Sequence, residues 1–151
     1  MSNEVGPGSA VSSRLGYLFK HAGMRLAQLN EEALAPLGID ARELAVLLLI
    51  ADNEPASQQQ AAQRLGVDRT TMVALLDALE GKGLLSRRPQ VGDRRRNVVE
   101  LTNAGQDTLR RATRASDDAE HALLASLTAL DADRLRDLLK TVATRSDNSE
   151  D

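Results

Sequence analysis

The spacing of apolar residues changes twice along this chain, and those changes limit the folds open to it. Between residues 11 and 82, and again between 103 and 145, apolar residues recur at the three- and four-residue spacing of helices. Between these segments, LLSRR (84–88) and NVVEL (97–101) are short strand-like runs around a loop with Pro89 and Gly92. The sequence therefore predicts a mainly α fold with a minor β component, a single hairpin.

Capping residues divide the helical segments. Ser57, Asp68 and Thr102 are expected N-caps, and Gly66 is expected to end a short helix in the left-handed conformation. The expected helices span about 11–34, 40–51, 58–65, 69–82 and 103–129, with a last helix opened by Asp131. The ends, 1–10 and 146–151, are expected to be flexible tails, the second of them acidic.

Composition excludes several classes of function. The chain has no Cys, no Trp, one Tyr and one Phe. The lack of Cys excludes disulfides and thiolate metal sites, and the scarcity of aromatic residues weighs against a platform for single-stranded RNA. With two isolated His, no HExxH motif and no phosphate-binding loop, we expect no enzyme activity, no metal site and no cofactor.

The longest unbroken apolar run, residues 44–51, is too short to cross a bilayer. No basic segment leads into an apolar core at the N-terminus, so no secretion signal is visible. A cytoplasmic protein without a membrane partner is the expectation.

Charge is unevenly distributed. The net charge is −3, yet residues 64–96 hold eight basic and four acidic residues, which leaves −7 for the rest. An acidic body with one basic segment favours an anionic partner bound at that segment, although a solvated loop would look the same.

Residues 58–82 have the pattern of a helix-turn-helix, with the glycine-containing turn LGVD (65–68) between two helices. If Met72, Leu75, Leu76 and Leu79 face the core, the opposite face is small and polar, as a helix entering a major groove about 12 Å wide requires. Thr70, Val73 and Ala74 lie on this face with Asp77, and Arg69 and Thr71 lie on its flanks. The candidate DNA contacts are Arg69, Thr70, Thr71, Val73 and Ala74. In isolation, an ordinary capped surface helix would explain these residues equally well.

The hairpin supports the DNA-binding interpretation. Its loop carries Asp93, Arg94, Arg95 and Arg96, and guanidinium groups are favoured in a narrow groove lined by phosphates. Asp93 can hold a neighbouring guanidinium in place, and Lys82, Arg87 and Arg88 are expected to contact the DNA backbone. A helix-turn-helix followed by a basic hairpin is much less common by accident than either part alone.

The segments LLDALEGKGLLSRR, DRR and VELTNAG resemble, in order and spacing, the winged helix-turn-helix of the MarR family of bacterial transcription regulators. The resemblance covers about residues 11–145. It implies a winged helix-turn-helix domain at 37–102 and dimerisation helices at 11–36 and 103–145. It also implies that Arg95 enters the minor groove with Asp93 as its holder, and that Arg69, Thr70, Thr71 and Val73 lie on the recognition helix.

The chain departs from the family pattern at two recognition positions. Val73 stands where Thr is common, and Ala74 stands where a long polar side chain is common. Bases are therefore expected to be read more through apolar contact, Arg69 and groove shape than through bidentate hydrogen bonds.

Dimerisation is also expected from the residues alone, because the apolar stripes of the terminal helices exceed what the winged unit could cover. A two-fold dimer would place two recognition helices about 34 Å apart on pseudo-palindromic double-stranded DNA.

The resemblance further implies release from DNA by a small anionic aromatic effector. Arg14, His21 and Arg25 can share one face of the first helix and are the candidate ligand residues. Surface or dimer-interface roles are the simpler interpretation of these three residues. The alternative to a DNA-binding repressor is a winged-helix protein-interaction module without DNA binding.

Overall fold

A computed structural model describes residues 8–52, 58–90 and 92–144. The elements, in chain order, are α1 (Ser9–Ser12), α2 (Leu15–Leu34), the 3-10 turn η1 (Ala35–Leu37), α3 (Ala41–Ala51), α4 (Gln58–Leu65), α5 (Arg69–Gly81), β1 (Leu85–Gln90), β2 (Asp93–Leu101), α6 (Asn103–Leu123) and α7 (Ala129–Ala143). The mainly helical fold with one hairpin is confirmed. Below, α3, α4, α5, β1 and β2 are together called the winged unit.

The helices predicted for the middle of the chain are confirmed, because local caps define them. The Asp40 carboxylate accepts from the Glu43 N–H at 2.8 Å, and Glu43 in turn accepts from the Asp40 N–H, which is a capping box at the start of α3. The predicted cap Ser57 lies outside the described residues. Thr102 caps α6 as predicted, since its hydroxyl accepts from the Gly105 N–H at 3.0 Å.

Three helix boundaries were predicted wrongly. The first helix is broken after Ser12, and α2 begins only at Leu15. The long helix α6 ends at Leu123 rather than near residue 129. Thr128, not Asp131, caps the last helix: its hydroxyl accepts from the Asp131 N–H at 3.2 Å, which places Asp131 inside the first turn of α7.

The hairpin strands are longer than predicted and the loop is shorter. β1 pairs antiparallel with β2, with Leu85 opposite Leu101 and Arg87 opposite Val99. The register shifts between Pro89 and Gln90, and most of the residues expected in the loop belong to strands. Backbone pairing therefore continues past Pro89, which is compatible with a two-stranded sheet because Pro is tolerated on edge strands.

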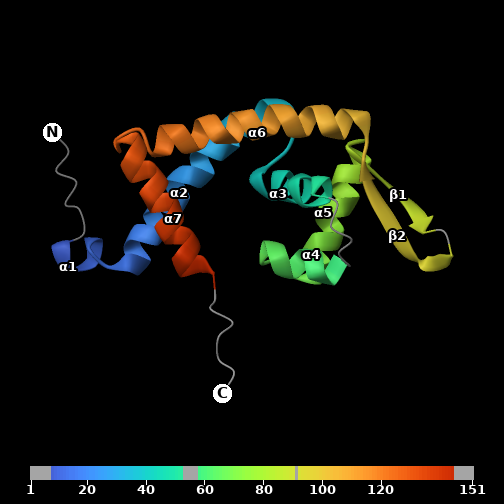
Figure 1. Ribbon diagram of the computed structural model, residues 1–151, viewed down its shortest axis with the longest axis horizontal. Coiled ribbons are helices and arrows are strands. Elements are labelled where there is room, and N and C mark those ends of the chain that lie inside the picture. The colour runs from blue at the N-terminus through green and yellow to red at the C-terminus, as the bar shows by residue number, and fades with distance from the viewer. Residues whose placement is uncertain (1–7, 53–57, 91, 145–151) are drawn as a thin grey trace, which may run out of the picture.

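The core lies between α3, α5, β1 and the inner faces of α2 and α6. Its fully buried large side chains are Leu34, Val46, Leu47, Met72, Leu79 and Leu85. Figure 1 shows α6 running along one edge of the molecule, with α2 and α7 at one of its ends and the hairpin at the other. α2 packs along α6, where Ser116 and Asn30 share a 3.2 Å hydrogen bond.

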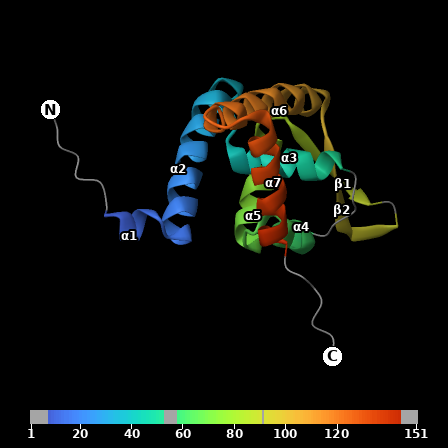
Figure 2. The same ribbon diagram turned by 60° about the vertical axis from the view of Figure 1, so that its left-hand side comes forward.

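The terminal helices leave apolar side chains exposed. α7 buries none of its residues, and its Leu138 and Val142 are 62% and 73% exposed. On α2, Leu15, Leu18 and Phe19 are exposed as well. Figure 2 shows the N-terminal half of α2 standing clear of the winged unit. This exposed apolar surface of α2 and α7 is called the terminal apolar face below.

In the described parts of the chain, no helix combines the length and the apolar character that a membrane span needs.

Candidate nucleic-acid interface

The helix-turn-helix is built from α4 and α5 and the turn between them. Gly66 has φ 66°, in the left-handed region that favours glycine, and it ends α4 as predicted. The Val67 N–H donates to the Ala62 carbonyl at 3.0 Å, which closes the turn. The Asp68 carboxylate then accepts from the Thr71 N–H at 2.6 Å and begins α5. Local hydrogen bonds thus set the angle at which α5 follows α4.

α5 divides its residues between core and surface as its sequence predicts. Met72, Leu76 and Leu79 are buried, and Leu75 is half-buried against the same core. The candidate DNA contacts lie on the other side, where Arg69, Thr70 and Ala74 are exposed and Thr71 and Val73 are half-buried. The outward face of α5 is therefore small and accessible near its N-terminus, which is the shape that groove insertion requires.

The cap of α5 makes the helix sensitive to acid. The backbone N–H of Thr71 holds the pKa of the Asp68 carboxyl below its ordinary value of 3.8. A carboxyl whose pKa is lower in the folded state stabilises the fold above its unfolded pKa, and that stabilisation is lost as the pH falls through the lowered value. Below pH 3.8 we expect the melting temperature of the unsubstituted protein, called the parent below, to fall more steeply than that of Asp68→Asn. The reason is that Asn also caps helices but does not titrate. Thermal melts from pH 6 to pH 2.5 of both proteins test this, and parallel pH profiles would contradict it.

Three of the predicted backbone contacts have partners within the protein. Arg87 pairs with Asp77 and, at 3.5 Å, with Glu80, both on α5, and its side chain is only 17% exposed. Arg88 pairs across the hairpin with Glu100. The Arg87 pairs join the first strand of the hairpin to α5, whereas the Arg88 pair joins the two strands to each other. A phosphate would have to compete with the carboxylates for either guanidinium.

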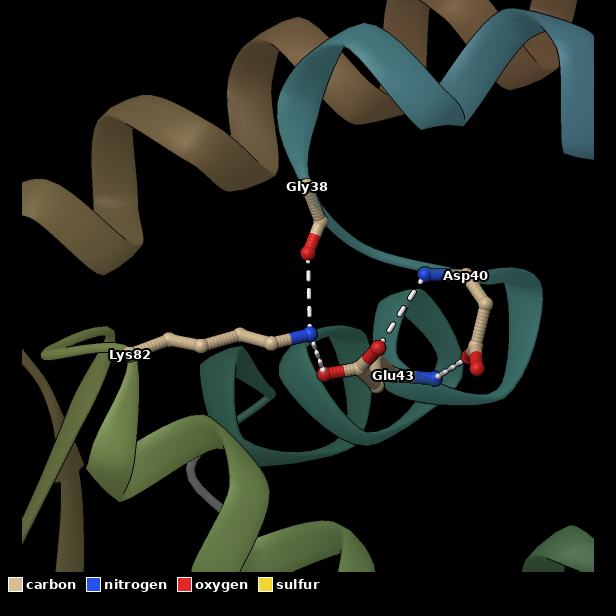
Figure 3. A network of polar contacts seen from close by, with 4 residues as sticks. All are labelled: Gly38, Asp40, Glu43 and Lys82. Atoms are coloured by element: carbon tan, nitrogen blue, oxygen red, sulfur yellow. Dashed lines mark hydrogen bonds and ion pairs between the residues drawn. The ribbon is translucent and has the colours of Figure 1, made fainter.

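Lys82 is also engaged. Its ammonium donates to the Glu43 carboxylate at 2.6 Å and to the Gly38 carbonyl at 2.8 Å (Figure 3). Sequence reasoning assigned Lys82 to DNA and did not identify Glu43 as a partner. The capping pattern of Asp40 and Glu43 was visible in the sequence, but the approach of Lys82, 39 residues later, was not.

The tip of the hairpin is described only in its backbone. Asp93 to Arg96 lie in β2, next to a turn in which Gly92 has φ 92°. The side chains of Asp93, Arg94, Arg95 and Arg96 lie outside the described part of the structure, so their DNA contacts stay predictions. The hairpin itself projects from the end of the molecule opposite α2 and α7 (Figure 1).

The candidate ligand residues lie on or just before α2 and are all exposed. Arg14 is the N-cap position of the helix, and Arg25 lies near its middle. His21 stacks on Tyr17, with ring centroids 4.0 Å apart, and sequence reasoning did not consider Tyr17 although the two are one helical turn apart. A hollow between α3, β2 and the start of α6 is lined by other residues, among them Ile50, Leu109 and Arg110. Within the described ranges, no group of three acidic, His or Cys side chains could hold a metal ion.

Known proteins of one family resemble this chain over most of its length. The sequence model of the MarR family matches residues 37–96. The transcriptional repressor Rv2887 of Mycobacterium tuberculosis strain H37Rv is 30% identical over 122 residues, which cover 81% of this chain and 88% of the repressor. Among solved structures, the transcriptional repressor CouR bound to a 23-mer DNA duplex has 35% identity and a TM-score of 0.83, covering 90% of this chain and 96% of CouR. CouR from Rhodococcus jostii RHA1 bound to p-coumaroyl-CoA has 27% identity and a TM-score of 0.79, covering 92% and 98%. The sequence identity to these regulators extends over most of the chain, and the helix-turn-helix and hairpin have the same arrangement as in them. This chain therefore belongs to the MarR family of transcriptional regulators.

Proposed function

We propose that this protein is a homodimeric repressor that binds pseudo-palindromic double-stranded DNA and leaves it when a small anionic aromatic effector binds. The observation that carries the proposal is the exposed, small outward face of α5, set at the end of a capped turn and followed by a hairpin with three consecutive arginines in β2. In the relative CouR, the same arrangement is found bound to a DNA duplex. A cytoplasmic location and the absence of enzyme activity belong to the same proposal.

Dimerisation follows from the terminal apolar face. A single chain leaves Leu15, Leu130, Leu138 and Val142 between 62% and 73% exposed. Apolar side chains gathered on exposed helix faces in this way are typical of a surface that another chain covers. A two-fold dimer through α2 and α7 buries them and presents two copies of α5 to successive turns of one DNA face.

We assign the DNA contacts to two groups. Arg69, Thr70, Thr71, Val73 and Ala74 would meet the major groove, and Asp93, Arg94, Arg95 and Arg96 would meet the minor groove and its phosphates. Arg87 and Arg88 take part only if DNA displaces their carboxylate partners, so we expect them to contribute less than Arg95.

The effector proposal rests on relatives and on α2. CouR has been seen with p-coumaroyl-CoA, an anionic molecule with an aromatic group. Arg14, His21 and Arg25 would supply charge and hydrogen bonds, and the Tyr17–His21 stack would supply a flat surface. Such a ligand releases DNA only if it binds better to a dimer whose recognition helices are wrongly spaced.

One observation favours a second candidate, a winged-helix module that binds protein instead of DNA. Lys82, Arg87 and Arg88 are all paired with carboxylates of their own chain, which lowers the free positive charge beside α5. Binding to a pool of random duplexes, followed by sequencing of the retained fragments, separates the two functions. Enrichment of a two-fold symmetric sequence supports the repressor, and retention of no duplex at low salt supports the module.

The wing arginine offers a direct test. We expect Arg95→Ala to weaken binding to the selected duplex by about 1–3 kcal/mol per wing, because a guanidinium in a narrow minor groove is lost. Fluorescence anisotropy measures the affinity, and sedimentation should show an unchanged dimer. Arg42→Ala, which removes an exposed arginine from the start of α3, is the matched control and should bind as the parent does. Equal affinity of Arg95→Ala and the parent would remove the wing from the interface.

A further inference from the structure

Glu43 is the one charged residue among the described side chains that is buried, with 6% of its surface exposed. A buried carboxylate is costly unless both of its oxygens find partners. Here Oε1 accepts from the Asp40 N–H at 3.2 Å, and Oε2 accepts from the Lys82 ammonium at 2.6 Å. Each oxygen of the Glu43 carboxylate therefore has a hydrogen-bond partner within the chain.

Lys82 and Gly38 each stand where two parts of the molecule meet. Lys82 is the C-cap residue of the recognition helix α5. Gly38, with φ 73°, ends the η1 turn that connects α2 to α3. Figure 3 shows the Lys82 side chain reaching across to the Gly38 carbonyl and to Glu43 at the start of α3. One ammonium thus joins the end of the recognition helix to the point where the long N-terminal helix stops.

The Lys82 contacts lie at one of the two connections between the winged unit and the long helices α2 and α6. The chain passes between α2 and the winged unit through the Gly38 turn, and between the winged unit and α6 through Thr102. At the second junction, the Thr102 N–H donates to the Leu84 carbonyl at 3.1 Å and its hydroxyl donates to the Gly83 carbonyl at 2.6 Å. At the α2 connection, the hydrogen bonds of Lys82 to the Gly38 carbonyl and to Glu43 have the corresponding role.

We infer that Lys82 is a positioning residue and not a phosphate contact: with Glu43 and the Gly38 carbonyl it fixes the angle between α2 and the recognition helix. In a dimer built on α2 and α7, this angle sets the distance between the two copies of α5. The inference rests on the proposed dimeric DNA-binding function. The new element is that an ion pair inside each subunit, away from the groove-facing residues, sets the half-site spacing that the dimer prefers.

The distance can be measured without DNA. The chain has no Cys, so Ala74→Cys, exposed on α5, gives one spin label per subunit. Double electron–electron resonance on the full-length dimer should give a narrow distance distribution in the labelled parent. Lys82→Met and Glu43→Gln should each broaden that distribution or move its mean by more than the parent's width. Arg88→Met, which breaks an exposed pair within the hairpin, is the control and should leave the distribution unchanged.

The second measurement uses the selected duplex and versions of it with one base pair added or removed between the half-sites. Lys82→Met should lose the parent's preference for the native spacing, while the dependence of log affinity on log salt keeps its slope. If Lys82 instead contacted phosphate, the slope would fall by about 0.9 for each lost contact and the spacing preference would remain. Circular dichroism confirms that each variant is folded. Where Lys82→Met fails this check, Glu43→Gln carries the comparison of spacing preference, because it removes the ion pair and keeps the side-chain volume.

The outcomes separate the two claims. An unchanged distance distribution in a folded Lys82→Met or Glu43→Gln dimer overturns the positioning role, whatever the DNA result. If the variants change the distribution but the unlabelled parent retains no duplex, the positioning role is supported and the proposed DNA-binding function is overturned.

Discussion

Gly105→Ala will destabilise the protein strongly, although it adds only one methyl group. A Cβ at Gly105 would lie 1.9 Å from the Leu84 carbonyl oxygen and 2.9 Å from its carbon, and both are backbone atoms. Relief of this clash requires α6 to move away from the base of the hairpin, which breaks the hydrogen bonds of Thr102 to Gly83 and Leu84. Overpacking of this kind costs about 1–3 kcal/mol and more where backbone must move, so the melting temperature should fall by roughly 10 °C.

Thermal unfolding followed by circular dichroism, at one fixed protein concentration, measures this loss. Gly81→Ala is the matched control, because its Cβ would meet no atom within 4 Å and Gly81 ends a helix. Alanine favours helix over glycine by up to about 1 kcal/mol, so the control should be neutral or slightly stabilising. Equal melting temperatures for Gly105→Ala and the parent would show that α6 does not approach the Leu84 backbone this closely.

Leu138→Glu combined with Val142→Glu will convert the dimer to monomers. The two side chains are 62% and 73% exposed in the single chain and are one turn apart on α7. Burial of an aliphatic side chain is worth at least about 1.5 kcal/mol, so four lost side chains across a dimer remove roughly 6 kcal/mol, about 10⁴-fold in dimerisation constant. Monomers should also bind DNA much more weakly, because the two half-sites are no longer bound as one unit.

Sedimentation equilibrium gives the mass, and anisotropy on the selected duplex gives the affinity. Lys140→Glu is the control, since Lys140 lies two residues from both Leu138 and Val142 and therefore on the opposite side of α7. It places a carboxylate on that exposed side and should remain dimeric. A dimer that survives Leu138→Glu with Val142→Glu would place the subunit contact elsewhere.

The elements of the winged unit were predictable because each carries its own signal within a few residues. Asp68 and Thr71 are three positions apart, and Gly66 needs only its own conformation to end α4. The alternation of buried and exposed residues along α5 likewise depends on helical periodicity alone. These features involve hydrogen bonds and spacings that any part of the chain makes with its near neighbours.

The errors arose where two local signals competed. Thr128 and Asp131 are both good N-caps, and only the structure shows that Thr128 caps α7. The break between α1 and α2 falls at Ser13 and Arg14, and periodicity alone extended one helix across them. Ser12 and Ser13 favour a helix end over a helix interior, but this signal is weak beside the apolar spacing.

The sequence by itself determined the order of the main elements, the family and the division of α5 into a core side and an outward side, because periodicity, caps and motif spacing are local properties. Only the tertiary structure decided which cations remain available to a ligand. Lys82 meets Glu43 and Gly38 across 39 and 44 residues, and Arg87 meets Asp77 across a helix end and a turn. Basic residues that look equivalent along the chain differ in function because the free energy of an ion pair depends on distance and burial, and folding alone sets both.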